Sequence, residues 1–476
     1  MGQTADLAVI GSGGAAFSAA IRARNLGKSV VMIERGTVGG TCVNVGCVPS
    51  KALIAAAQAR HVAADASARF AGIAAAVGPV DMPALIEAKQ ALVEDLRSAK
   101  YLDIAEAHGW PIRHGEASFE GTPGTPVLRV TDTDGTSEVI EAAHYLVATG
   151  AQPWVPDLPG LDDVDYLTST TAMELTHVPE SLLILGGGYV ALELAQLYAR
   201  LGSKVTMLVR SRLASHEEPE VNQALQSVFA EEGIRVVRRT RITALCRDEA
   251  TGEVVATANV SGGKSEFRAE QVLVALGRRP VTDRLNLAAV EVKTGQDGEI
   301  MVENTLATSN RRIWAAGDVT GHHEFVYVAA AHGAIAVDNA FTAADRTVDY
   351  AYLPRVTFTS PAVGAVGMTD EQAVAAGIRC TCRVLPLDYV PRALVNRDTR
   401  GFIKVVADDE TGRILGITAV AKDAGELAAA GVYILQAGMT TQQVAATWAP
   451  YLTMAESIKL ACRAYTTDPA QLSCCA

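Results

Sequence analysis

Several features of specialised proteins are scarce in this chain of 476 residues. Eight cysteines are too few for a disulfide scaffold, and 41 lysines and arginines against 53 aspartates and glutamates leave a net charge of −12. A nucleic-acid binder would show a basic excess, so the composition argues against that class. The first residues include Asp6 and no basic segment, and three glycines and two arginines interrupt the apolar stretch that follows. We therefore expect no signal peptide or membrane span and predict a cytoplasmic protein.

The composition is that of a packed globular protein, with 49% apolar and 20% charged residues. At about 150 residues per domain, the length suggests roughly three domains. Aromatic residues reach only 5%, whereas there are 41 glycines, which fits a fold with many tight backbone approaches.

A repeat is the clearest internal feature. Residues 6–35 and 181–210 align at a constant offset without gaps, and each copy reads as an apolar strand, a glycine turn, a helix and a second apolar strand. Both contain the pattern G-x-G-x-x-A at the turn. The first glycine allows the turn, the second lets the backbone approach a pyrophosphate, and the helix N-terminus faces the negative charge. The repeat therefore predicts two βαβ units that bind dinucleotides.

The two copies differ at the end of the second strand. The first copy ends in Glu34, an acid placed to bind ribose hydroxyls, whereas the second has Val209 followed by Arg210. An acid favours a free 2′-hydroxyl and a cation favours a 2′-phosphate. We therefore predict an unphosphorylated dinucleotide at the first site and NADP(H) at the second. The alternative for Arg210 is a solvated surface charge.

Further strands are expected after each repeat, and the pattern of apolar and polar residues changes near residue 350. Residues 143–150 and 270–277 read as strands that run into glycine turns, and residues 312–318 repeat this pattern and end in Asp318. The last region has no dinucleotide fingerprint and reads as an interface domain. Its predicted antiparallel strands lie within residues 353–367 and 401–420, and its predicted helices span 425–438 and 454–465.

A cysteine pair follows the first repeat directly. Four residues separate Cys42 and Cys47 in the segment GGTCVNVGCVPSK. In a cytoplasmic protein such a pair indicates a redox disulfide or a metal site, and zinc fits poorly because no second pair lies nearby. Glycines and Pro49 predict a tight loop that leads into a helix over residues 52–60. A thiolate near that helix N-terminus would have a lowered pKa.

The same segment resembles the active-site segment of the FAD-dependent pyridine nucleotide–disulfide oxidoreductases. The order of first fingerprint, cysteine pair, second fingerprint, AAGD motif and C-terminal region is similar to that family over nearly the whole chain. The resemblance implies an α/β fold with two Rossmann-like dinucleotide-binding domains and a C-terminal α+β dimerisation domain, as in glutathione reductase. It implies an FAD domain over residues 1–152 and 280–350, an NADPH domain over 153–279 and an interface domain over 351–476.

The resemblance also implies roles for single residues. Cys47 would contact the flavin as a thiolate, and Cys42 would meet the substrate. Lys51 would lie near the flavin and pair with Glu193, and Tyr189 would cover the nicotinamide pocket until NADPH arrives. The residues implied to bind the cofactors FAD and NADPH are Gly11, Gly13, Gly14, Ala15, Glu34, Gly40, Thr41, Lys51, Thr149, Gly150, Asp318, Gly186, Gly188, Arg210 and Gly277.

The C-terminal tail narrows the expected substrate. Cys474 and Cys475 are adjacent near the end of the chain, where residues are usually exposed. As a disulfide they would close a small strained ring, so they are better suited to capturing a soft metal cation. The tail resembles that of the mercuric reductases, although thioredoxin reductases can also carry a C-terminal thiol pair.

A missing histidine separates these two groups. Disulfide reductases of the family need a general acid near the C-terminus, usually a histidine paired with a glutamate. Here Glu456 is present, Tyr451 stands at the histidine's place, and no histidine follows His332. A metal ion has no thiol leaving group that requires such an acid. The segment Pro-Tyr-Leu-Thr-Met is similar to that of mercuric reductases, and we expect a catalytic core without their N-terminal metal-binding module.

The resulting hypothesis is NADPH-dependent reduction of Hg(II) to Hg(0) in a homodimer. Cys474 and Cys475 of one subunit would take Hg(II) from its thiol complexes and pass it to Cys42 and Cys47 of the other, with Tyr189 and Tyr451 lining the inner site. The alternatives are an NADPH-dependent disulfide reductase of the thioredoxin reductase type and a flavoprotein that sequesters metal without turnover. Two further groups read as ordinary structure or as metal ligands: the strand residues Cys380 and Cys382, and the loop His322-His323-Glu324.

Overall fold

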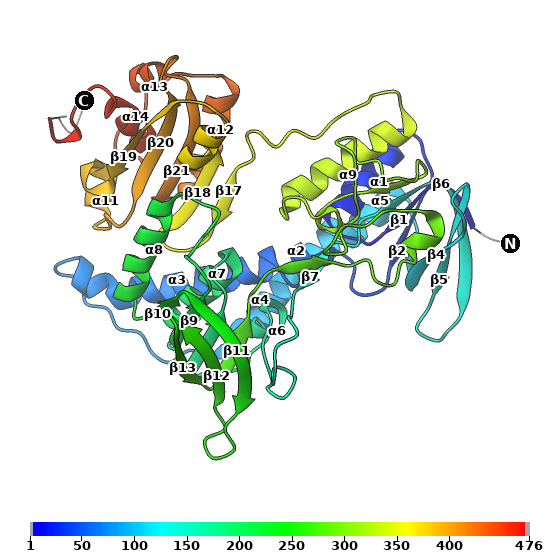
Figure 1. Cartoon of the computed structure of the whole chain (residues 1–476), viewed down its shortest axis with the longest axis horizontal. Coiled ribbons are helices and arrows are strands. Elements are labelled where there is room, and N and C mark those ends of the chain that lie inside the picture. The colour runs from blue at the N-terminus through cyan, green and yellow to red at the C-terminus, as the bar shows by residue number, and fades with distance from the viewer. Residues whose placement is uncertain (1–2, 472–476) are drawn as a thin grey trace.

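The computed structural model describes residues 3–471, and Figure 1 shows the arrangement of its elements. The N-terminal sheet has seven strands in the order β3-β2-β1-β6-β5-β4, with β16 paired to β6. The pairs among β1, β2, β3, β6 and β16 are parallel, whereas β4 and β5 are antiparallel. The strands are β1 (Gln3–Ile10), β2 (Val30–Glu34), β3 (Ile112–His114), β4 (Glu116–Thr122), β5 (Thr125–Thr131), β6 (Ser137–Val147) and β16 (Ile313–Ala315).

Two helices pack closely against each other on this sheet. Helix α1 (Gly14–Asn25) follows the first fingerprint, and its buried face consists mostly of alanine. It contacts α9 (Val326–Phe341), and a Cβ atom at Gly333 of α9 would meet the carbonyl oxygen of Ala15 at 2.1 Å. Small side chains on α1 and the glycine at position 333 thus permit the close approach of the two helices.

The middle of the chain forms a second parallel sheet and a small antiparallel sheet. The parallel sheet has the order β10-β9-β8-β14, and α7 (Tyr189–Leu201) and α8 (Pro219–Glu231) accompany it. Its strands are β8 (Ser181–Leu185), β9 (Lys204–Val209), β10 (Arg235–Arg238) and β14 (Gln271–Val274). The antiparallel sheet comprises β11 (Thr240–Arg247), β12 (Val254–Val260) and β13 (Gly263–Ala269), and a two-stranded ribbon pairs β7 (Ala151–Pro153) with β15 (Arg278–Pro280).

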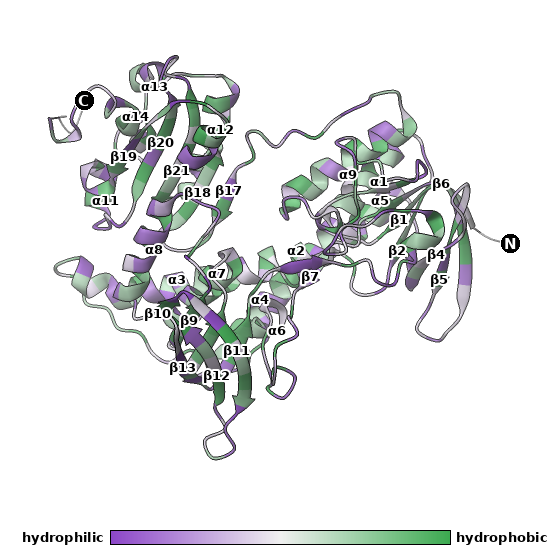
Figure 2. Cartoon of the chain, viewed as in Figure 1, coloured by the Kyte–Doolittle hydropathy of each residue, from purple (hydrophilic) through white to green (hydrophobic). Residues whose placement is uncertain are grey.

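The last region forms a five-stranded antiparallel sheet with the order β17-β18-β21-β20-β19. Its predicted strands and helices are confirmed, with ends that differ by a few residues. Figure 2 shows hydrophobic residues along β20 and β21. The elements are β17 (Arg355–Thr357), β18 (Ala362–Gly367), β19 (Cys380–Pro386), β20 (Phe402–Asp408), β21 (Ile414–Ala421), α10 (Asp370–Ala375), α11 (Pro391–Val395), α12 (Ala424–Gln436), α13 (Thr441–Ala446) and α14 (Glu456–Arg463).

The helix after the cysteine pair begins earlier than predicted. It spans α3 (Cys47–Arg69) and not residues 52–60, because Pro49 lies in the first turn, where its missing N–H has no helical partner to lose. Before it lies α2 (Gly40–Asn44), and after it come α4 (Met82–Arg97), a π-helical turn (Ser98–Leu102), α5 (Asp103–His108) and, further on, α6 (Ser169–Ala172).

One helical stretch among residues 3–471 is long and apolar enough to cross a membrane by length and composition alone, namely Gly40–Arg69. It consists of α2 and α3, and α3 contacts α7 within the molecule. Core helices meet the same criterion, so this stretch is weak evidence for a membrane span.

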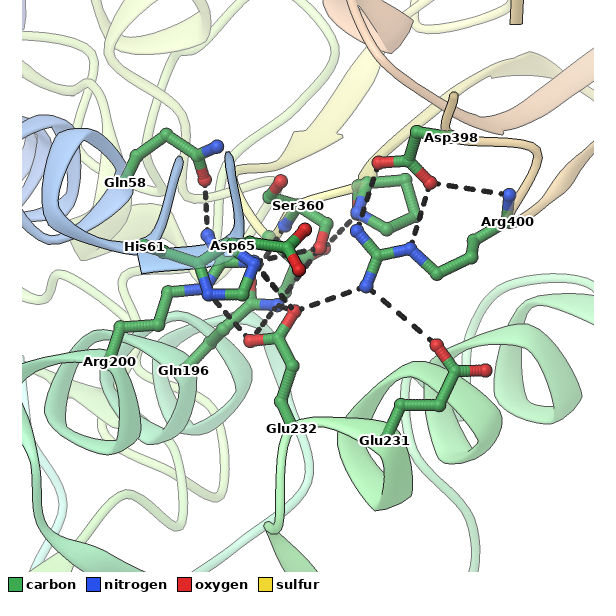
Figure 3. A network of polar contacts seen from close by, with 12 residues as sticks. Gln58, His61, Asp65, Gln196, Arg200, Glu231, Glu232, Ser360, Asp398 and Arg400 are labelled. Carbon is green, nitrogen blue, oxygen red and sulfur yellow. Dashed lines mark hydrogen bonds and ion pairs between the residues drawn. The ribbon is translucent and has the colours of Figure 1, made fainter. Parts of the chain in front are cut away.

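A buried polar network joins α3 and α7 to the C-terminal sheet (Figure 3). Arg200 on α7 donates two hydrogen bonds to Glu232, at 2.8 and 2.7 Å, and Arg400 just before β20 contacts the same carboxylate at 3.3 Å. Arg200 also donates to the carbonyl oxygen of Ser360. Burial acts to raise the pKa of Glu232, but the hydrogen bonds and charge of Arg200, together with the charges of His61 and Arg400, lower it overall. Gln58 and His61 on α3 contact Arg200 and Glu232, so the network joins the helix that begins at Cys47 to α7 and to the C-terminal sheet.

Candidate active site

A cavity of about 490 Å³ lies where the first fingerprint, the cysteine segment and α7 meet. A second cavity of about 270 Å³ adjoins it, because both are lined by Gly11, Glu34 and Thr149. The predicted site residues that line the larger cavity are Gly11, Gly13, Gly14, Ala15, Glu34, Gly40, Thr41, Cys42, Cys47, Lys51, Thr149, Gly150, Tyr189, Glu193 and Asp318. The structure thus brings together groups from four distant parts of the chain.

The glycine turns of the two repeats have the same local geometry. Gly11 has a φ of +102°, and a Cβ atom there would meet the carbonyl oxygen of Ala148 at 2.4 Å. Gly186 has a φ of +133°, and a Cβ atom there would meet the carbonyl oxygen of Ala275 at 2.2 Å. Only glycine fits such a position without strain. Each turn therefore lets its strand pass close to the end of a neighbouring parallel strand.

Glu34 is held in a defined orientation at the first turn. Ser12 donates a hydrogen bond to one carboxylate oxygen at 2.6 Å, and the backbone N–H of Gly36 donates to the other at 2.7 Å. Ser12, the middle residue of the G-x-G pattern, was not singled out by the sequence analysis. Gly40 has a φ of +66°, and a Cβ atom there would meet the Cα atom of Gly13 at 2.6 Å. Two bare backbones thus form a narrow cradle at the N-terminus of α1, which fits the pyrophosphate of a dinucleotide.

The two cysteines of the pair interact directly. A hydrogen bond with the Cys42 thiol lowers the pKa of Cys47 to about 6, and the positive charge of Lys51 contributes against the opposing effect of partial burial. The same hydrogen bond, together with burial, raises the pKa of Cys42. Cys47 is also the first residue of α3, where the helix dipole favours a thiolate. At neutral pH the pair therefore holds one thiolate, on Cys47, and one thiol, on Cys42.

We expect this thiolate to be lost as the pH falls through about 6, the pKa of Cys47. Because the pKa lies below the value for a free cysteine, the thiolate is present at neutral pH and is protonated only in acid. The measurement is the ultraviolet thiolate absorbance of the dithiothreitol-reduced protein, taken as the difference from a Cys47→Ser variant. In Lys51→Met the midpoint should rise by about one pH unit, since an attractive charge is removed. An unchanged midpoint in that variant would contradict the assignment.

Lys51 and Glu193 form the ion pair that the resemblance implies. Lys51 Nζ donates to Glu193 Oε2 at 2.7 Å, and the other oxygen of Glu193 accepts from the backbone N–H of Phe358 at 2.9 Å. The Lys51 ammonium also lies over the Phe358 ring, 4.7 Å from its centroid. No sequence signal pointed to Phe358, because it comes from a segment more than 150 residues away from Glu193 in the chain. These contacts fix the cation near the Cys47 thiolate.

A second charged group faces Tyr189. The Tyr189 hydroxyl donates to Glu324 Oε2 at 3.4 Å, and Arg278 lies 3.7 Å from Glu324 and 3.9 Å from Asp318. Burial raises the pKa of both carboxyl groups, while Arg278 opposes the rise. Arg278 and Glu324 line the cavity. Arg278 was not predicted as a site residue, and Glu324 was considered only as part of a loop that could hold a metal ion. Arg278 directly follows the glycine turn at Gly277, which was the available signal.

The three residues of the polar loop His322-His323-Glu324 face different surroundings. Glu324 faces the cavity, whereas the rings of His322 and His323 pack against Tyr350, at 5.7 and 5.0 Å between centroids. Within residues 3–471 no group of three or more histidine, cysteine or acidic side chains is arranged to hold a metal ion. The expectation that ordinary loop structure accounts for the two histidines fits these contacts.

The predicted residues of the second nucleotide site lie at the end of the second parallel sheet. Gly188 precedes α7 with a φ of −82°, and a Cβ atom there would meet nothing within 4 Å. Arg210 is exposed just after β9. Arg212 donates to the backbone carbonyls of Ser215 and Glu217 and is thus engaged in its own loop. An open helix N-terminus with an exposed cation nearby fits a phosphorylated nucleotide.

The remaining predicted site residues lie elsewhere. Gly186, Gly188, Arg210 and Gly277 do not line the larger cavity, although α7 begins directly after Gly188 and brings Tyr189 into it. Tyr451 does not line it in the same chain either and is 49% exposed before α14. Cys474 and Cys475 lie outside the described residues.

The fold and the cavity define a dinucleotide-dependent oxidoreductase that carries a cysteine pair beside its cofactor cavity. Residues 5–333 match the family model for pyridine nucleotide-disulphide oxidoreductases, and residues 353–462 match the dimerisation domain of that family. The chain belongs to the pyridine nucleotide-disulphide oxidoreductase family, which confirms the predicted fold class. The second match makes the C-terminal sheet part of a dimerisation domain.

Known relatives cover almost the whole chain. The mercuric reductase of Streptomyces lividans is 57% identical over 99% of this chain and 98% of the relative, and that of Shigella flexneri is 44% identical over 99% of this chain and 82% of the relative. Among solved structures, the Cu(II) complex of the HOCl-induced flavoprotein disulfide reductase RclA from Escherichia coli has a TM-score of 0.86 at 27% identity and covers 98% of this chain and 100% of that one. LpdA from Mycobacterium tuberculosis has the same TM-score at 26% identity and the same coverage.

The cofactors of this chain are FAD and NADPH. The residues present fit both groups. The cradle of Gly13 and Gly40 and the oriented Glu34 carboxylate suit an unphosphorylated dinucleotide, and the open N-terminus of α7 near Arg210 suits a phosphorylated one.

Proposed function

We propose that this protein reduces Hg(II) to Hg(0) with NADPH, with Cys42 and Cys47 as the inner ligands of the ion. The observation that carries the proposal is that Cys42, Cys47 and Lys51 line the same cavity. The hydrogen bond from Cys42 and the charge of Lys51 lower the pKa of Cys47. Thiolates select soft cations, so this pair suits Hg(II). Relatives named mercuric reductase that cover at least 99% of the chain support the substrate.

The overall reaction is balanced by a single hydride. NADPH gives up two electrons and becomes NADP⁺, Hg(II) takes both and becomes Hg(0), and one proton is released. When bound, FAD supplies the ability to accept a hydride and pass two electrons onward. The chain itself binds and orients the partners and keeps the thiols in the form that the ion requires.

The inner pair takes the ion by ligand exchange. Cys42, which the resemblance implies meets the substrate, takes the thiol-bound Hg(II) first and passes its proton to the departing thiolate of the carrier. The Cys47 thiolate then displaces the second carrier ligand and completes the pair of bonds to the ion, because the thiolate is the nucleophilic form. The Lys51 ammonium, fixed by Glu193 and Phe358, keeps Cys47 ionised during this exchange. Hg(0) has little affinity for thiolates and leaves.

We further propose that the active site is shared between two subunits. Tyr451 is part of the segment before α14 and does not line the cavity of its own chain, so we assign it, with Cys474 and Cys475, to the cavity of the partner subunit. The dimerisation domain over residues 353–462 supports a homodimer. Tyr189 and Tyr451 would then line the inner site from two chains.

Transfer of Hg(II) from Cys474 and Cys475 to the inner pair, here called the tail relay, predicts a loss of activity when the two tail cysteines are replaced. A double variant, Cys474→Ala with Cys475→Ala, should lose about 10²-fold or more in kcat/KM for Hg(II) supplied with excess cysteine, because tethered thiols act at a high effective concentration. Steady-state NADPH oxidation measures this. NADPH oxidation by an artificial electron acceptor is the control and should not change. Full activity of the double variant on thiol-complexed Hg(II) would remove the relay.

A disulfide reductase of the thioredoxin reductase type is the alternative that the tail leaves open. Its required acid is missing, because Tyr451 stands where a histidine would be expected, and the relatives named mercuric reductase do not favour it. The deciding experiment compares NADPH oxidation with Hg(II), oxidised thioredoxin and oxidised glutathione, and measures volatile mercury. We expect mercury release and turnover with Hg(II) only. Turnover with either disulfide and no mercury release would overturn the proposal.

Arg210 is proposed to recognise the 2′-phosphate of NADPH. In Arg210→Ala the kcat/KM for NADPH should fall roughly 10- to 100-fold, the worth of a hydrogen bond to a charged group, while that for NADH changes little. Kinetics with both nucleotides measure the ratio. Lys204→Ala is the matched control, since Lys204 is an exposed cation at the opposite end of β9. An equal loss with NADH would mean that Arg210 contributes to general binding only.

We further propose a division of the chain into three domains and a location in the cytoplasm. We assign residues 1–152 and 280–350 to FAD, 153–279 to NADPH and 351–476 to the interface, because the N-terminal sheet, the second parallel sheet and the C-terminal sheet fall within these limits. We place the protein in the cytoplasm, where thiol carriers keep Hg(II) complexed and NADPH is available.

A further inference from the structure

Two cysteines outside the cavity lie together on an edge strand. Cys380 and Cys382 begin β19, which is the outer strand of the five-stranded sheet (Figure 1). In the antiparallel pairing with β20, Cys380 lies opposite Asp408 and Cys382 opposite Val406. Side chains two residues apart on a strand point to the same face of the sheet. Both thiols therefore share one face, and both are partly exposed.

The two thiols also interact electrostatically. Burial raises the pKa of Cys382, and the charge and hydrogen bonding of Cys380 raise it further. Cys380 Sγ lies 3.9 Å from the carbonyl oxygen of Asp370 at the start of α10. The Lys404 ammonium is close enough to act on Cys382 in the opposite sense, and its own carboxylate partners are Glu218, Glu220 and Asp370.

The spacing suits a bridging ion better than a disulfide. Residues two apart on a strand are about 6.6 Å apart along the chain, whereas a disulfide requires Cβ atoms about 3.8 Å apart. A linear two-coordinate ion with metal–sulfur bonds of about 2.3 Å would hold the two sulfurs roughly 4.6 Å apart. This separation is closer to the spacing of same-face strand positions than the Cβ separation of a disulfide is.

We propose that Cys380 and Cys382 form a second binding site for Hg(II), held by two thiolates on the surface of the dimerisation domain. Binding is a ligand exchange without redox change. A bis-thiol complex of Hg(II) gives up both carrier ligands, two bonds to the protein sulfurs form, and the two cysteine protons pass to the departing thiols. Neither cysteine lines the cofactor cavity, so an ion bound here is retained and not reduced in place.

The proposal is independent of turnover, and its test is a binding measurement without NADPH. The full-length, FAD-loaded protein is prepared with the four cysteines of the inner and tail pairs replaced by serine or alanine. It is dialysed to equilibrium against HgCl₂ in excess free cysteine, and bound mercury is counted per chain. We expect about one Hg(II) per chain, since two thiolates on one rigid strand chelate more strongly than two independent thiols.

Single replacements then distinguish a chelate from separate thiols. Adding Cys380→Ser or Cys382→Ser should weaken binding by about 10²- to 10⁴-fold in either case, because each leaves a single thiol. Cys246→Ser is the matched control, since Cys246 is an exposed cysteine on β11 without a cysteine neighbour two positions away. It should leave binding unchanged. FAD content and dimer mass verify that each variant is folded.

Two results would overturn the proposal. One is that the variant in which the inner and tail cysteine pairs are replaced retains no mercury. The other is retention that survives either single replacement, which would mean independent thiols. If the variant that lacks the four other cysteines does not fold, bound mercury is counted on the otherwise unaltered protein. Replacing both Cys380 and Cys382 there must lower the bound mercury by one ion per chain. Reduction of Hg(II) can succeed or fail separately, because this readout contains no reductant.

Discussion

Replacing Cys47 by serine is expected to lower Hg(II)-dependent NADPH oxidation by about a thousandfold or more, the size of loss seen when an essential reacting group is removed. Serine has nearly the shape of cysteine but no thiolate at neutral pH and little affinity for a soft cation. The ion would then be left with Cys42 as its single inner thiol ligand. Steady-state kinetics and release of volatile mercury measure the loss.

The control for this variant uses another exposed thiol. Cys246→Ser removes an exposed cysteine from β11, far in sequence from the cavity, and should keep the activity of the unaltered protein. Cys42→Ser should show a loss of the same order as Cys47→Ser, since both ligands are required. If either inner variant kept more than about a tenth of the activity, the pair would not be the inner ligands of the ion.

Alanine substitutions at Gly186 and Gly188, two nearby glycines of the second repeat, are expected to have different effects on stability. Gly186→Ala should destabilise the fold by about 2–5 kcal/mol, because its φ of +133° strains any other residue and its Cβ atom would meet the Ala275 carbonyl oxygen at 2.2 Å. Gly188→Ala should leave the stability nearly unchanged, since its φ is ordinary and no atom lies within 4 Å of the new Cβ. Denaturant unfolding of the two variants measures this difference.

The same pair separates folding from nucleotide binding. The open space at Gly188 is where the backbone would approach the pyrophosphate of NADPH, so its variant should raise the KM for NADPH about tenfold while the protein stays folded. Gly186→Ala should lower the yield of folded protein whether or not nucleotide is present. An unaltered KM in Gly188→Ala would place the nucleotide elsewhere, and equal instability of both variants would contradict the local geometry.

Much of the site could be predicted from short-range signals. The two fingerprints fixed the glycine turns, and Glu34 against Arg210 suggested different nucleotides, because these signals depend only on residues within one βαβ unit. The cysteine pair was equally local. The predicted start of the helix α3 was wrong. Pro49 is typical of a loop in the sequence, although the first turn of a helix also tolerates proline.

The groups that surround the local motifs could not be read in the same way. Arg278 reaches the cavity from the start of β15 and Glu324 from the loop before α9, and Phe358 comes from the C-terminal region to contact both Lys51 and Glu193. Each contact joins residues far apart in the chain, and no periodicity or spacing encodes such a pairing. The neighbouring thiols of Cys380 and Cys382 were placed on one face by strand alternation, but their position on the edge strand required the sheet order.

The amino-acid sequence by itself determined the class of fold, the two nucleotide turns and the cysteine pair, since each is written within a few tens of residues by backbone conformation and side-chain type. Only the tertiary structure decided which distant charges meet at the pair and what lowers the pKa of the Cys47 thiol. The pKa of a thiol depends on the hydrogen bonds, burial and charges around it, and these are set by where separate segments pack.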